Sequence, residues 1–448
     1  MYGIGYHCRT MSQYACNEFE SQQDHVYRTS RQRYLVYLFL PFHYILKRKY
    51  YSIYCRKLGF FYVGLRIINH LLTKLMKKIL TLVAMVSFLM APATAQELNN
   101  FSRGHQQVKS PEINGEKVTF RLSANYATVV NLQGNWMENG SIPMLKGQNG
   151  VWEVTVDTPS PEIYTYNFVV DGVSVNDPQN YMVQRDGTRY LNMLMVPGER
   201  TENYFEANQR GTVTYRWYDS KILGINRRVT VYTPYGYETS GKKYPVLYLL
   251  HGAGGDEEAW TSMGRTAQIL DNLIEKGLAQ PMIVVMPNGN PGQQAAQTLG
   301  LPEKQIDRRD PAMADAYVKS LCTEIVPFIE KNFRVIAKPE SRAIAGLSMG
   351  GGHTITATNL YPAMFDWICP LSAAGSSTPE QITALKKAGV KLYFLACGTS
   401  DFLWEQSVTL DKTMTDCGLE HTFYKSDGGH VWANWRLYLN TFAQLLFK

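Results

Sequence analysis

The chain has 448 residues, which gives room for two or three domains. Its formal net charge is +7, but residues 1–95 hold 13 Lys/Arg and 3 Asp/Glu, so residues 96–448 hold 32 basic and 35 acidic residues, a net of −3. A segment this close to neutral gives no indication of nucleic-acid binding.

Residues 76–95 have the parts of a secretory signal. Positive charge at residues 76–78 precedes an apolar run of about a dozen residues, and a small-residue cleavage site follows at residues 93–95. We therefore expect translation to start with the signal, residues 1–75 not to be part of the native protein, and Gln96 to become the first residue. A membrane-bound leader is the alternative, but its apolar patches are too short or too charged for a convincing span. The predicted localisation is periplasmic or extracellular, with no integral membrane span in the mature chain.

Residues 96–198 are predicted to form a small all-β domain, and residues 199–212 a polar linker. The alternating segments that predict strands are Lys117–Leu122, Ala127–Leu132, Val151–Val156 and Tyr164–Val170. Short strands at this spacing are typical of an immunoglobulin-like β-sandwich. The stretch Asn131–Trp136, together with Trp152 and its neighbours, resembles the early-set, glycogen-binding-type modules, which implies carbohydrate binding. Trp136 and Trp152 could stack on sugar rings, but Trp152 lies in an alternating strand and is as easily a core residue. A structural or substrate-framing role of the domain is the alternative to sugar binding, and both interpretations stay open.

Residues 213–448 alternate strands with helical stretches, which predicts an α/β domain whose mostly parallel sheet is covered on both faces. Two helical apolar stripes indicate core positions; they consist of Met313, Tyr317, Leu321, Ile325 and Phe328, and of Trp435, Leu439, Phe442 and Leu446. Residues 288–311 are rich in Gly, Gln and Asn, and a loop of this length is expected to shape an acyl or sugar pocket. Because the sequence has no P-loop, dinucleotide fingerprint or zinc-ligand set, we expect no cofactor and no metal.

The most informative motif is Gly346-Leu-Ser-Met-Gly350, a G-x-S-x-G sequence. A predicted strand, Ser341–Ala345, precedes it, and a helical run that ends near Leu360 follows it. This is the setting of the nucleophile elbow of α/β-hydrolases, in which a sharp strand-to-helix turn presents the serine. Ser348 is therefore the predicted nucleophile.

A serine hydroxyl needs a base to accept its proton, and in α/β-hydrolases that base follows the serine along the chain. The histidines downstream of Ser348 are His353, His421 and His430. His353 lies in the helix directly after the serine and is too near along the chain, while His421 lies in a strand-like segment and is interpreted as a surface residue. His430 lies on a glycine-rich loop before the last helix, so it is the predicted base.

The acid is expected between Ser348 and His430, on a loop that follows a strand. Asp401 fits this position, because it follows the apolar run Lys391–Cys397 and a short Gly-Thr-Ser segment. Asp427 is the rival, since it is close to the base along the chain. Asp401 is the predicted acid.

The oxyanion that forms during ester attack needs two backbone N–H donors. One is expected from Met349, the residue after the nucleophile, and the other from the loop after the strand Tyr244–Leu250. That loop, His251–Gly255, is rich in glycine, and Ala253 is the predicted donor.

Several motifs together resemble the family-one carbohydrate esterases, which include feruloyl and acetyl-xylan esterases. They are His251–Asp256 with Trp260, Met286–Gly289, Gly346–Gly351, Gly398–Asp401, and Gly428–Trp432 with Trp435 and Arg436. The resemblance covers about residues 213–448 and implies an α/β-hydrolase fold. It also implies a triad of Ser348, Asp401 and His430, with oxyanion amides at Ala253 and Met349. The wider superfamily includes enterochelin esterases, S-formylglutathione hydrolases and mycolyltransferases.

The predicted function is a secreted serine ester hydrolase that removes acyl groups from plant polysaccharide such as xylan, so acylated polysaccharide or oligosaccharide is the predicted partner. Trp260, Trp404 and Trp432 lie near the catalytic loops in sequence and are predicted to contact a feruloyl ring, which is favoured over acetate. Siderophore-ester hydrolysis or acyl transfer within the same superfamily is the alternative. An inactive glycan-binding protein is a more remote one.

Four cysteines follow the signal: Cys322, Cys369, Cys397 and Cys417. Their spacing is not that of a metal site, so the simplest interpretation is small buried apolar residues. Export would permit a disulfide, and the pairing considered is Cys397–Cys417.

Overall fold

The computed structural model describes residues 72–78, 108–307 and 315–448, and the chain divides into two compact units, Met1–Gly104 and His105–Lys448. In the first unit, residues 72–78 are helical. The rest of the predicted signal, including its cleavage site, lies outside the described residues. Within the part of the chain that is described, no helix combines the length and the apolar character that a membrane crossing requires.

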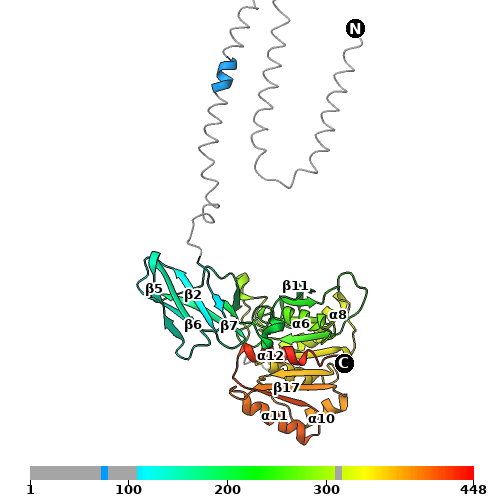
Figure 1. Cartoon of the computed structure of the whole chain (residues 1–448). Coiled ribbons are helices and arrows are strands. Elements are labelled where there is room, and N and C mark those ends of the chain that lie inside the picture. The colour runs from blue at the N-terminus through cyan, green and yellow to red at the C-terminus, as the bar shows by residue number, and fades with distance from the viewer. Residues whose placement is uncertain (1–71, 79–107, 308–314) are drawn as a thin grey trace, which may run out of the picture. The chain divides into compact units, whose positions relative to one another are not determined.

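The second unit begins with two antiparallel sheets, whose strands are cyan and green in Figure 1. The four-stranded sheet has the order β1-β2-β6-β5, with β1 Glu112–Asn114, β2 Lys117–Ser123, β6 Val151–Asp157 and β5 Leu145–Lys146. The other sheet has the order β4-β3-β7-β10-β9, and β8 also pairs with β7. Its strands are β3 Val130–Gly134, β4 Ser141–Pro143, β7 Ile163–Val170, β8 Val173–Val175, β9 Val183–Asp186 and β10 Arg189–Met195.

One apolar core is shared by these two sheets. It includes Phe120 of β2, Trp152 of β6 and Phe168 of β7, all of them buried. Trp152 donates its indole N–H to the backbone oxygen of Ala124 at 3.0 Å, and the ring of Trp136 stacks on that of Phe120 with centroids 6.0 Å apart. Both tryptophans therefore pack in the domain, which favours the core interpretation over sugar stacking. The kinship with glycogen-binding-type modules stays a prediction.

An eight-stranded sheet follows, in the order β11-β12-β14-β13-β15-β16-β17-β18. Its strands are β11 Thr212–Ser220, β12 Ile225–Thr233, β13 Val246–Leu250, β14 Ile283–Pro287, β15 Arg342–Leu347, β16 Trp367–Leu371, β17 Leu392–Gly398 and β18 Thr422–Ser426. Strand β12 pairs with β11 and β14 in the antiparallel sense, and all other neighbours are parallel. This is the mostly parallel sheet that the alternation of strands and helices predicts.

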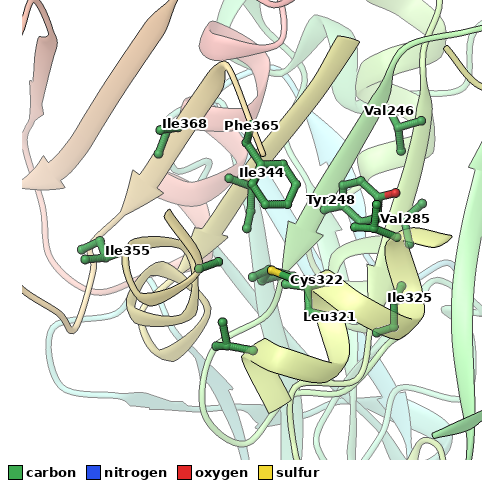
Figure 2. Close-up of a cluster of buried hydrophobic side chains, with 14 of the residues drawn as sticks. Val246, Tyr248, Val285, Leu321, Cys322, Ile325, Ile344, Ile355, Phe365 and Ile368 are labelled. Carbon is green, nitrogen blue, oxygen red and sulfur yellow. The ribbon is translucent and has the colours of Figure 1, made fainter. Parts of the chain in front are cut away.

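Helices cover both faces of this sheet, and each face has its own core. Helices α6 Thr266–Glu275 and α12 Trp432–Phe442 contribute to one core. The other core receives side chains from α7 Ala316–Ser320, η5 Leu321–Ile325, α8 Val326–Asn332, α9 Met349–Leu360, α10 Pro379–Ala388 and α11 Trp404–Asp416. Figure 2 shows part of this second core, where Tyr248 and Val285 of the sheet lie near Leu321 and Ile325 of the helical layer.

Strand β13 illustrates why such sequences form buried strands. All five of its residues are buried. Because successive side chains of a strand point to opposite faces, Tyr248 and Leu250 join one core, while Leu247 and Leu249 join the other. A central parallel strand with helices on both faces requires this continuous apolar run.

The predicted helical stripes lie in these cores. Tyr317 and Leu321 are buried on one side of the sheet, and Trp435 and Leu439 are buried on the other. Met313 of the first stripe lies outside the described residues.

The four described cysteines are free, so the pairing Cys397–Cys417 does not form. Cys397 is buried within β17, whereas Cys417 directly follows α11 and has its sulfur 3.7 Å from the backbone oxygen of Pro379. Cys322 and Cys369 are buried, as expected of small apolar residues.

The segment between the all-β and the α/β domain is packed rather than free. Its first part forms the 3₁₀ helix η2, Glu199–Tyr204, and Tyr204 is fully buried. The ring of Tyr204 joins Ile163 and Met193 of the all-β domain in the core that α12 also enters. The stretch predicted as a polar linker thus takes part in an apolar junction between the two domains.

Candidate active site

Ser348 lies at the end of β15, where the chain turns into α9. Its backbone has φ 54° and ψ −115°, a conformation that strains any residue with a Cβ. Neighbouring backbone holds the turn: the N–H of Ser348 donates to the oxygen of Leu371 at 2.9 Å. The C=O of Ser348 accepts from Gly352 and Ala374 at 3.0 and 3.1 Å. This is the strand–turn–helix arrangement that the motif predicts.

Position 350, two residues after the serine, has no room for a side chain. A Cβ at Gly350 would lie 2.6 Å from the backbone oxygens of Leu250 and His251, at the end of β13. The obstacle is backbone, which cannot move aside as a flexible side chain can. The first turn of α9 therefore lies directly against the loop that follows β13.

Asp401 and His430 lie on loops that follow the adjacent parallel strands β17 and β18. The Nδ1 atom of His430 is 3.0 and 2.9 Å from the two carboxylate oxygens of Asp401. Because a carboxylate only accepts hydrogen bonds, Nδ1 carries the proton, and Nε2 of the neutral ring keeps its lone pair. The side chain of Asp401 is fully buried, whereas that of His430 is 20% exposed.

Hydrogen bonds keep Asp401 in its charged form. Burial acts to raise the pKa of this carboxyl group, but donation from His430, from the N–H of Leu403 and from the hydroxyl of Ser372 brings the pKa below its ordinary value. The N–H of Leu403 is 2.9 Å from Oδ1. A charged carboxylate at Nδ1 stabilises the imidazolium that forms when Nε2 accepts a proton.

Two aromatic rings contact the imidazole of His430. The ring of Phe402 has its centroid 4.4 Å away, and the ring of Trp435 meets it edge-on at 4.9 Å. Trp435 in turn donates its indole N–H to the hydroxyl of Ser372 at 3.2 Å. Packing and hydrogen bonding therefore both restrict the orientation of the ring.

The rival candidates lie elsewhere. Asp427 is exposed. His421 contacts the carboxylate of Asp411 through Nε2 at 2.8 Å. The ring of His353, in α9, lies 4.7 Å from the ring of Tyr317. The carboxylate that contacts the predicted base, His430, belongs to Asp401, the predicted acid.

The loop His251–Gly255 lies beside the serine, since a Cβ at Gly252 would be 3.2 Å from the Cβ of Ser348. The imidazole of His251 anchors this loop: Nδ1 donates to the oxygen of Gly252, and Nε2 accepts from the N–H of Gly289, both at 2.7 Å. One ring nitrogen donates and the other accepts, so the ring is neutral. Burial accordingly lowers the pKa of His251.

The two predicted oxyanion donors are neighbours of the residues that meet here: Ala253 follows Gly252, and Met349 follows Ser348. Met349 is the first residue of α9, so its N–H is one of those that a helix leaves without an intrahelical partner. Ala253 lies on the glycine-rich loop and lines the same cavity as Ser348. Their role as oxyanion donors stays a prediction.

A cavity of about 830 Å³ is lined by Ser348, Ala253 and His430. Such a volume is within the range of small-molecule sites. Part of the lining comes from the all-β domain, and its polar members include Gln133, Asn135, Asn167, Gln184, Arg185 and Arg189. The cavity is therefore shared by the two domains.

Of the three tryptophans predicted to contact substrate, Trp432 lines this cavity. Trp260 is 1% exposed and donates its indole N–H to the oxygen of Leu250 at 2.9 Å, so it braces the end of β13. Trp404 begins α11 and stacks on Phe423 with centroids 5.4 Å apart. Trp260 and Trp404 are not among the described residues of the cavity wall, which argues against the contact predicted for them.

The loop predicted to shape the pocket also lies elsewhere over its described part, residues 288–307. The side-chain amide of Asn288 donates to Glu257 at 3.0 Å, and Gly289 donates to His251. None of these described residues lines the cavity. They support the loop that carries Ala253 from its other side.

Two residues of β9 were not predicted as site residues. Gln184 is 4% exposed and lines the cavity, and its Oε1 has no hydrogen-bond partner within the described chain. Arg185 pairs with Asp256, which is 71 positions away in the sequence and belongs to the other domain. Local patterns predict strands but not which distant residues they meet, so the sequence held no signal for either residue.

Comparisons with known proteins agree with the resemblance that the motifs indicate. Residues 220–413 match the family model described as a putative esterase. A curated relative, the endo-1,4-beta-xylanase/feruloyl esterase of Xylanibacter ruminicola, is 32% identical over 354 residues, which is 75% of this chain and 46% of the relative. This chain therefore spans about half the length of that relative.

Two solved structures are similar to this chain. The enterobactin esterase FES from Shigella flexneri is 17% identical, with a TM-score of 0.53 over 74% of this chain and 94% of the other. A ferulic acid esterase is 29% identical, with a TM-score of 0.46 over 54% of this chain and 100% of the other. The α/β-hydrolase fold predicted for residues 213–448 is confirmed.

Proposed function

We propose that this chain is a secreted serine ester hydrolase that removes acyl groups, feruloyl in preference to acetyl, from plant polysaccharide such as xylan. The observation that carries the proposal is the contact of Asp401 with His430. His430 lines the same cavity as Ser348, which lies at a strained turn. The match of residues 220–413 to the putative-esterase family supports the class of reaction. The similar Xylanibacter ruminicola protein is named as a feruloyl esterase as well as a xylanase, which supports the substrate.

In the proposed mechanism, the Oγ of Ser348 attacks the ester carbonyl carbon while Nε2 of His430 takes the hydroxyl proton. The bond to the sugar oxygen then breaks, and His430 gives the proton to the leaving alcohol. An acyl-enzyme remains. Water, deprotonated by the same imidazole, attacks the carbonyl carbon of the acyl-enzyme. The ester bond to Oγ of Ser348 then breaks, His430 returns the proton to Oγ, and the free acid leaves. Asp401 stays charged throughout and orients the ring.

The N–H groups of Ala253 and Met349 are the proposed donors to the oxyanion. Their supporting observation is that the loop of Ala253 approaches Ser348, while Met349 begins the helix that follows it. Removing one such donor typically lowers the rate by about 100- to 1000-fold.

The size and lining of the cavity favour a hydroxycinnamoyl group over acetate. An acetyl group fills a small fraction of about 830 Å³. A planar phenolic ring instead gains contact with an indole such as that of Trp432, which lines the cavity. Ferulate is therefore the proposed acyl group.

The polar wall from the all-β domain suits the sugar portion of the substrate. Gln184 presents a carbonyl oxygen that is shielded from solvent and has no hydrogen-bond partner among the described residues. An acceptor left without a donor in a buried position is unfavourable, and a sugar hydroxyl would satisfy it. Asn135 and Gln133 line the same cavity and offer further amide groups.

Turnover of p-nitrophenyl acetate by the wild type and by Ser348→Ala tests the reaction class. The wild type should hydrolyse the ester, and the variant should lose at least about 1000-fold in kcat, because the nucleophile is gone. Ser376→Ala, at an exposed serine, is the matched control and should keep wild-type activity. Equal turnover by wild type and Ser348→Ala would refute the proposed nucleophile.

Incubation with arabinoxylan that carries both feruloyl and acetyl groups tests the substrate. Quantifying the two released acids should give ferulate in excess. Acetate without ferulate would overturn the acyl preference and leave the reaction class intact. Turnover of siderophore esters with neither acid released from xylan would move the substrate to the other branch of the superfamily.

A further inference from the structure

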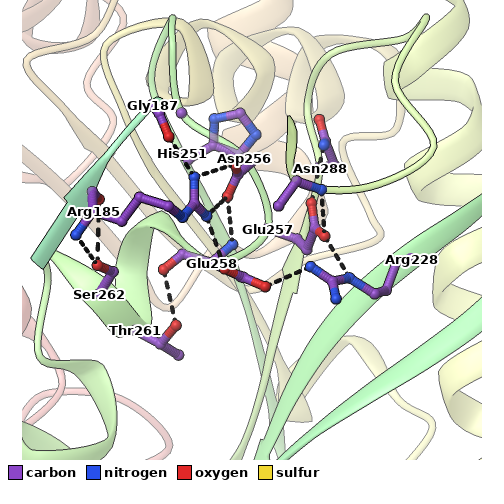
Figure 3. Close-up of polar contacts among 12 residues, drawn as sticks. Arg185, Gly187, Arg228, His251, Asp256, Glu257, Glu258, Thr261, Ser262 and Asn288 are labelled. Atoms are coloured by element: carbon purple, nitrogen blue, oxygen red, sulfur yellow. Dashed lines mark hydrogen bonds and ion pairs between the residues drawn. The ribbon is translucent and has the colours of Figure 1, made fainter. Parts of the chain in front are cut away.

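The guanidinium of Arg185 joins the all-β domain to the loop of the proposed oxyanion donor (Figure 3). Arg185 lies in β9, and its side chain is 6% exposed. Its two terminal nitrogens donate to the two carboxylate oxygens of Asp256, each at 2.7 Å. Asp256 follows Ala253 by three residues. A bidentate arginine–carboxylate pair fixes both the distance and the orientation of the carboxylate.

Further contacts make this connection rigid. Arg185 also donates to Glu258 at 2.8 Å and to the oxygen of Gly187 at 2.7 Å. The backbone N–H of Arg185 donates to the hydroxyl of Ser262, in helix α5 Ala259–Ser262, at 2.8 Å. The carboxylate of Asp256 accepts the N–H of Glu258 at 2.9 Å as well. The arginine therefore holds both the end of the loop and the turn that follows it.

Between its two ends the loop is rich in glycine. It contains Gly252, Gly254 and Gly255, and Gly254 has φ +80°. Glycine restricts the backbone least of all residues, so local propensity does not select one conformation here. At one end the loop is anchored by the imidazole of His251, and at the other end by Asp256.

We propose that Arg185 is a positioning residue, which holds the His251–Asp256 loop in the conformation that directs the N–H of Ala253 at the oxyanion. The inference rests on the proposed function. It means that the all-β domain contributes to the chemical step on any ester, including esters too small to reach its polar wall. An ion pair that only stabilised the fold would change the unfolding transition and leave transition-state binding unchanged.

Steady-state hydrolysis of p-nitrophenyl acetate by Arg185→Gln is the first measurement. The kcat should fall about 10- to 100-fold with KM within about twofold, because a displaced donor weakens transition-state binding more than substrate binding. Affinity for phenylboronic acid, which forms a tetrahedral adduct with the serine, should fall by the same factor as kcat/KM. Arg185→Lys keeps the charge without the fork and should recover part of the loss.

Arg200→Gln is the matched control. Arg200 forms an ion pair with Glu162 of the all-β domain at 2.9 Å, and it does not line the cavity. This variant should keep the wild-type kcat and boronic acid affinity. Loss of the boronic acid affinity in Arg200→Gln as well would mean that any weakening of the junction has this effect, and would overturn the specific role of Arg185.

Arg185→Gln leaves the buried carboxylate of Asp256 without its arginine partner. The thermal unfolding of this variant is therefore measured together with its kinetics. If it does not fold, the double variant Arg185→Gln/Asp256→Asn removes both charges and provides the same kinetic comparison. The double variant should lose no more kcat than Arg185→Gln, because the pair between Arg185 and Asp256 is already lost in the single variant. Unchanged kcat and boronic acid affinity in a folded variant would overturn the inference. A wild-type protein without ester turnover would instead overturn the proposed function.

Discussion

The contact of Asp401 with Nδ1 of His430 decides which tautomer the imidazole adopts. In Asp401→Asn, the amide N–H can take the place of a carboxylate oxygen, which favours a proton on Nε2. That tautomer cannot accept the proton of Ser348. We expect kcat to fall by about four orders of magnitude while the protein still folds. Steady-state kinetics and circular dichroism check both statements.

Asp427→Asn is the matched control for this substitution, because Asp427 is the exposed rival on the same loop as His430. We expect its kcat to stay within about twofold of the wild type, since surface substitutions of this kind have small effects. A large loss in Asp427→Asn together with near wild-type activity in Asp401→Asn would transfer the role of the acid.

The sequence predicts the contact of Asp401 with His430 because chain order and the ends of the strands constrain where the two residues lie. In an α/β sheet, a residue just past the carboxyl end of a strand lies at the same edge as its neighbours, whatever its side chain does. The contacts predicted for Trp260 and Trp404 depended on side-chain direction, which proximity in sequence does not determine. Trp260 donates to Leu250 and Trp404 stacks on Phe423.

Helix α9 packs so closely on the segment after β16 that Gly351, in its first turn, has no room for a side chain. A Cβ at Gly351 would lie 2.7 Å from both Cα and Cβ of Ala373. We expect Gly351→Ala to lower the free energy of unfolding by about 1–3 kcal/mol through overpacking. Because Ala374 donates to the carbonyl of Ser348, kcat should fall as well. Urea denaturation and ester kinetics measure the two effects.

Gly241→Ala is the control for this glycine, since a Cβ at Gly241 would meet no atom within 4 Å. Its stability should stay within about 0.5 kcal/mol of the wild type. If Gly351→Ala is as stable and as active as Gly241→Ala, α9 can move away from the sheet at little cost, and close packing does not determine the position of Ser348.

The elements themselves followed from periodicity and composition, because buried parallel strands need continuous apolar runs and covering helices need apolar stripes. The stretch containing Tyr204 carries a weaker signal. It is rich in polar residues, yet a single fully buried ring places it in a core that Ile163 and Met193 share. One aromatic residue in a polar segment is too little periodic signal to distinguish a packed connection from a free one.

The free energy of unfolding of the whole molecule depends on pH, and His353 contributes to this dependence. Burial, and to a smaller extent the nearby His251, lowers the pKa of His353 from 6.5 to about 4. Between these values the unfolded chain binds a proton that the folded protein does not. The free energy of unfolding therefore decreases as the pH falls from about 6.5 to about 4, with a contribution on the order of 2–3 kcal/mol.

Urea denaturation at a series of pH values measures this effect in the wild type and in His353→Phe, whose ring can keep the contact with Tyr317. The variant should lose less stability on acidification, and the two proteins should differ least in slope above about pH 7, where the histidine is neutral in both states. Parallel loss of stability in both proteins would assign the acid sensitivity to other groups, such as His251.

The sequence predicts the two domains but not the contacts between them. Strand patterns report on each domain separately, whereas the pair Arg185–Asp256 and the buried Tyr204 depend on how the two surfaces meet. Complementary charges on separate segments are common in any sequence, so this pairing could not be selected from the alternatives.

The cavity wall that the two domains share constrains how such a chain can diversify by recombination. Exchange of the all-β domain at the boundary near residues 199–204 would carry part of the cavity with it, including Gln184. On the proposed function, a graft would therefore alter which alcohol the active site accepts. It would also have to bring a guanidinium opposite Asp256 to retain the loop anchor. If the proposed function holds, the two domains have to be inherited together for activity to be kept.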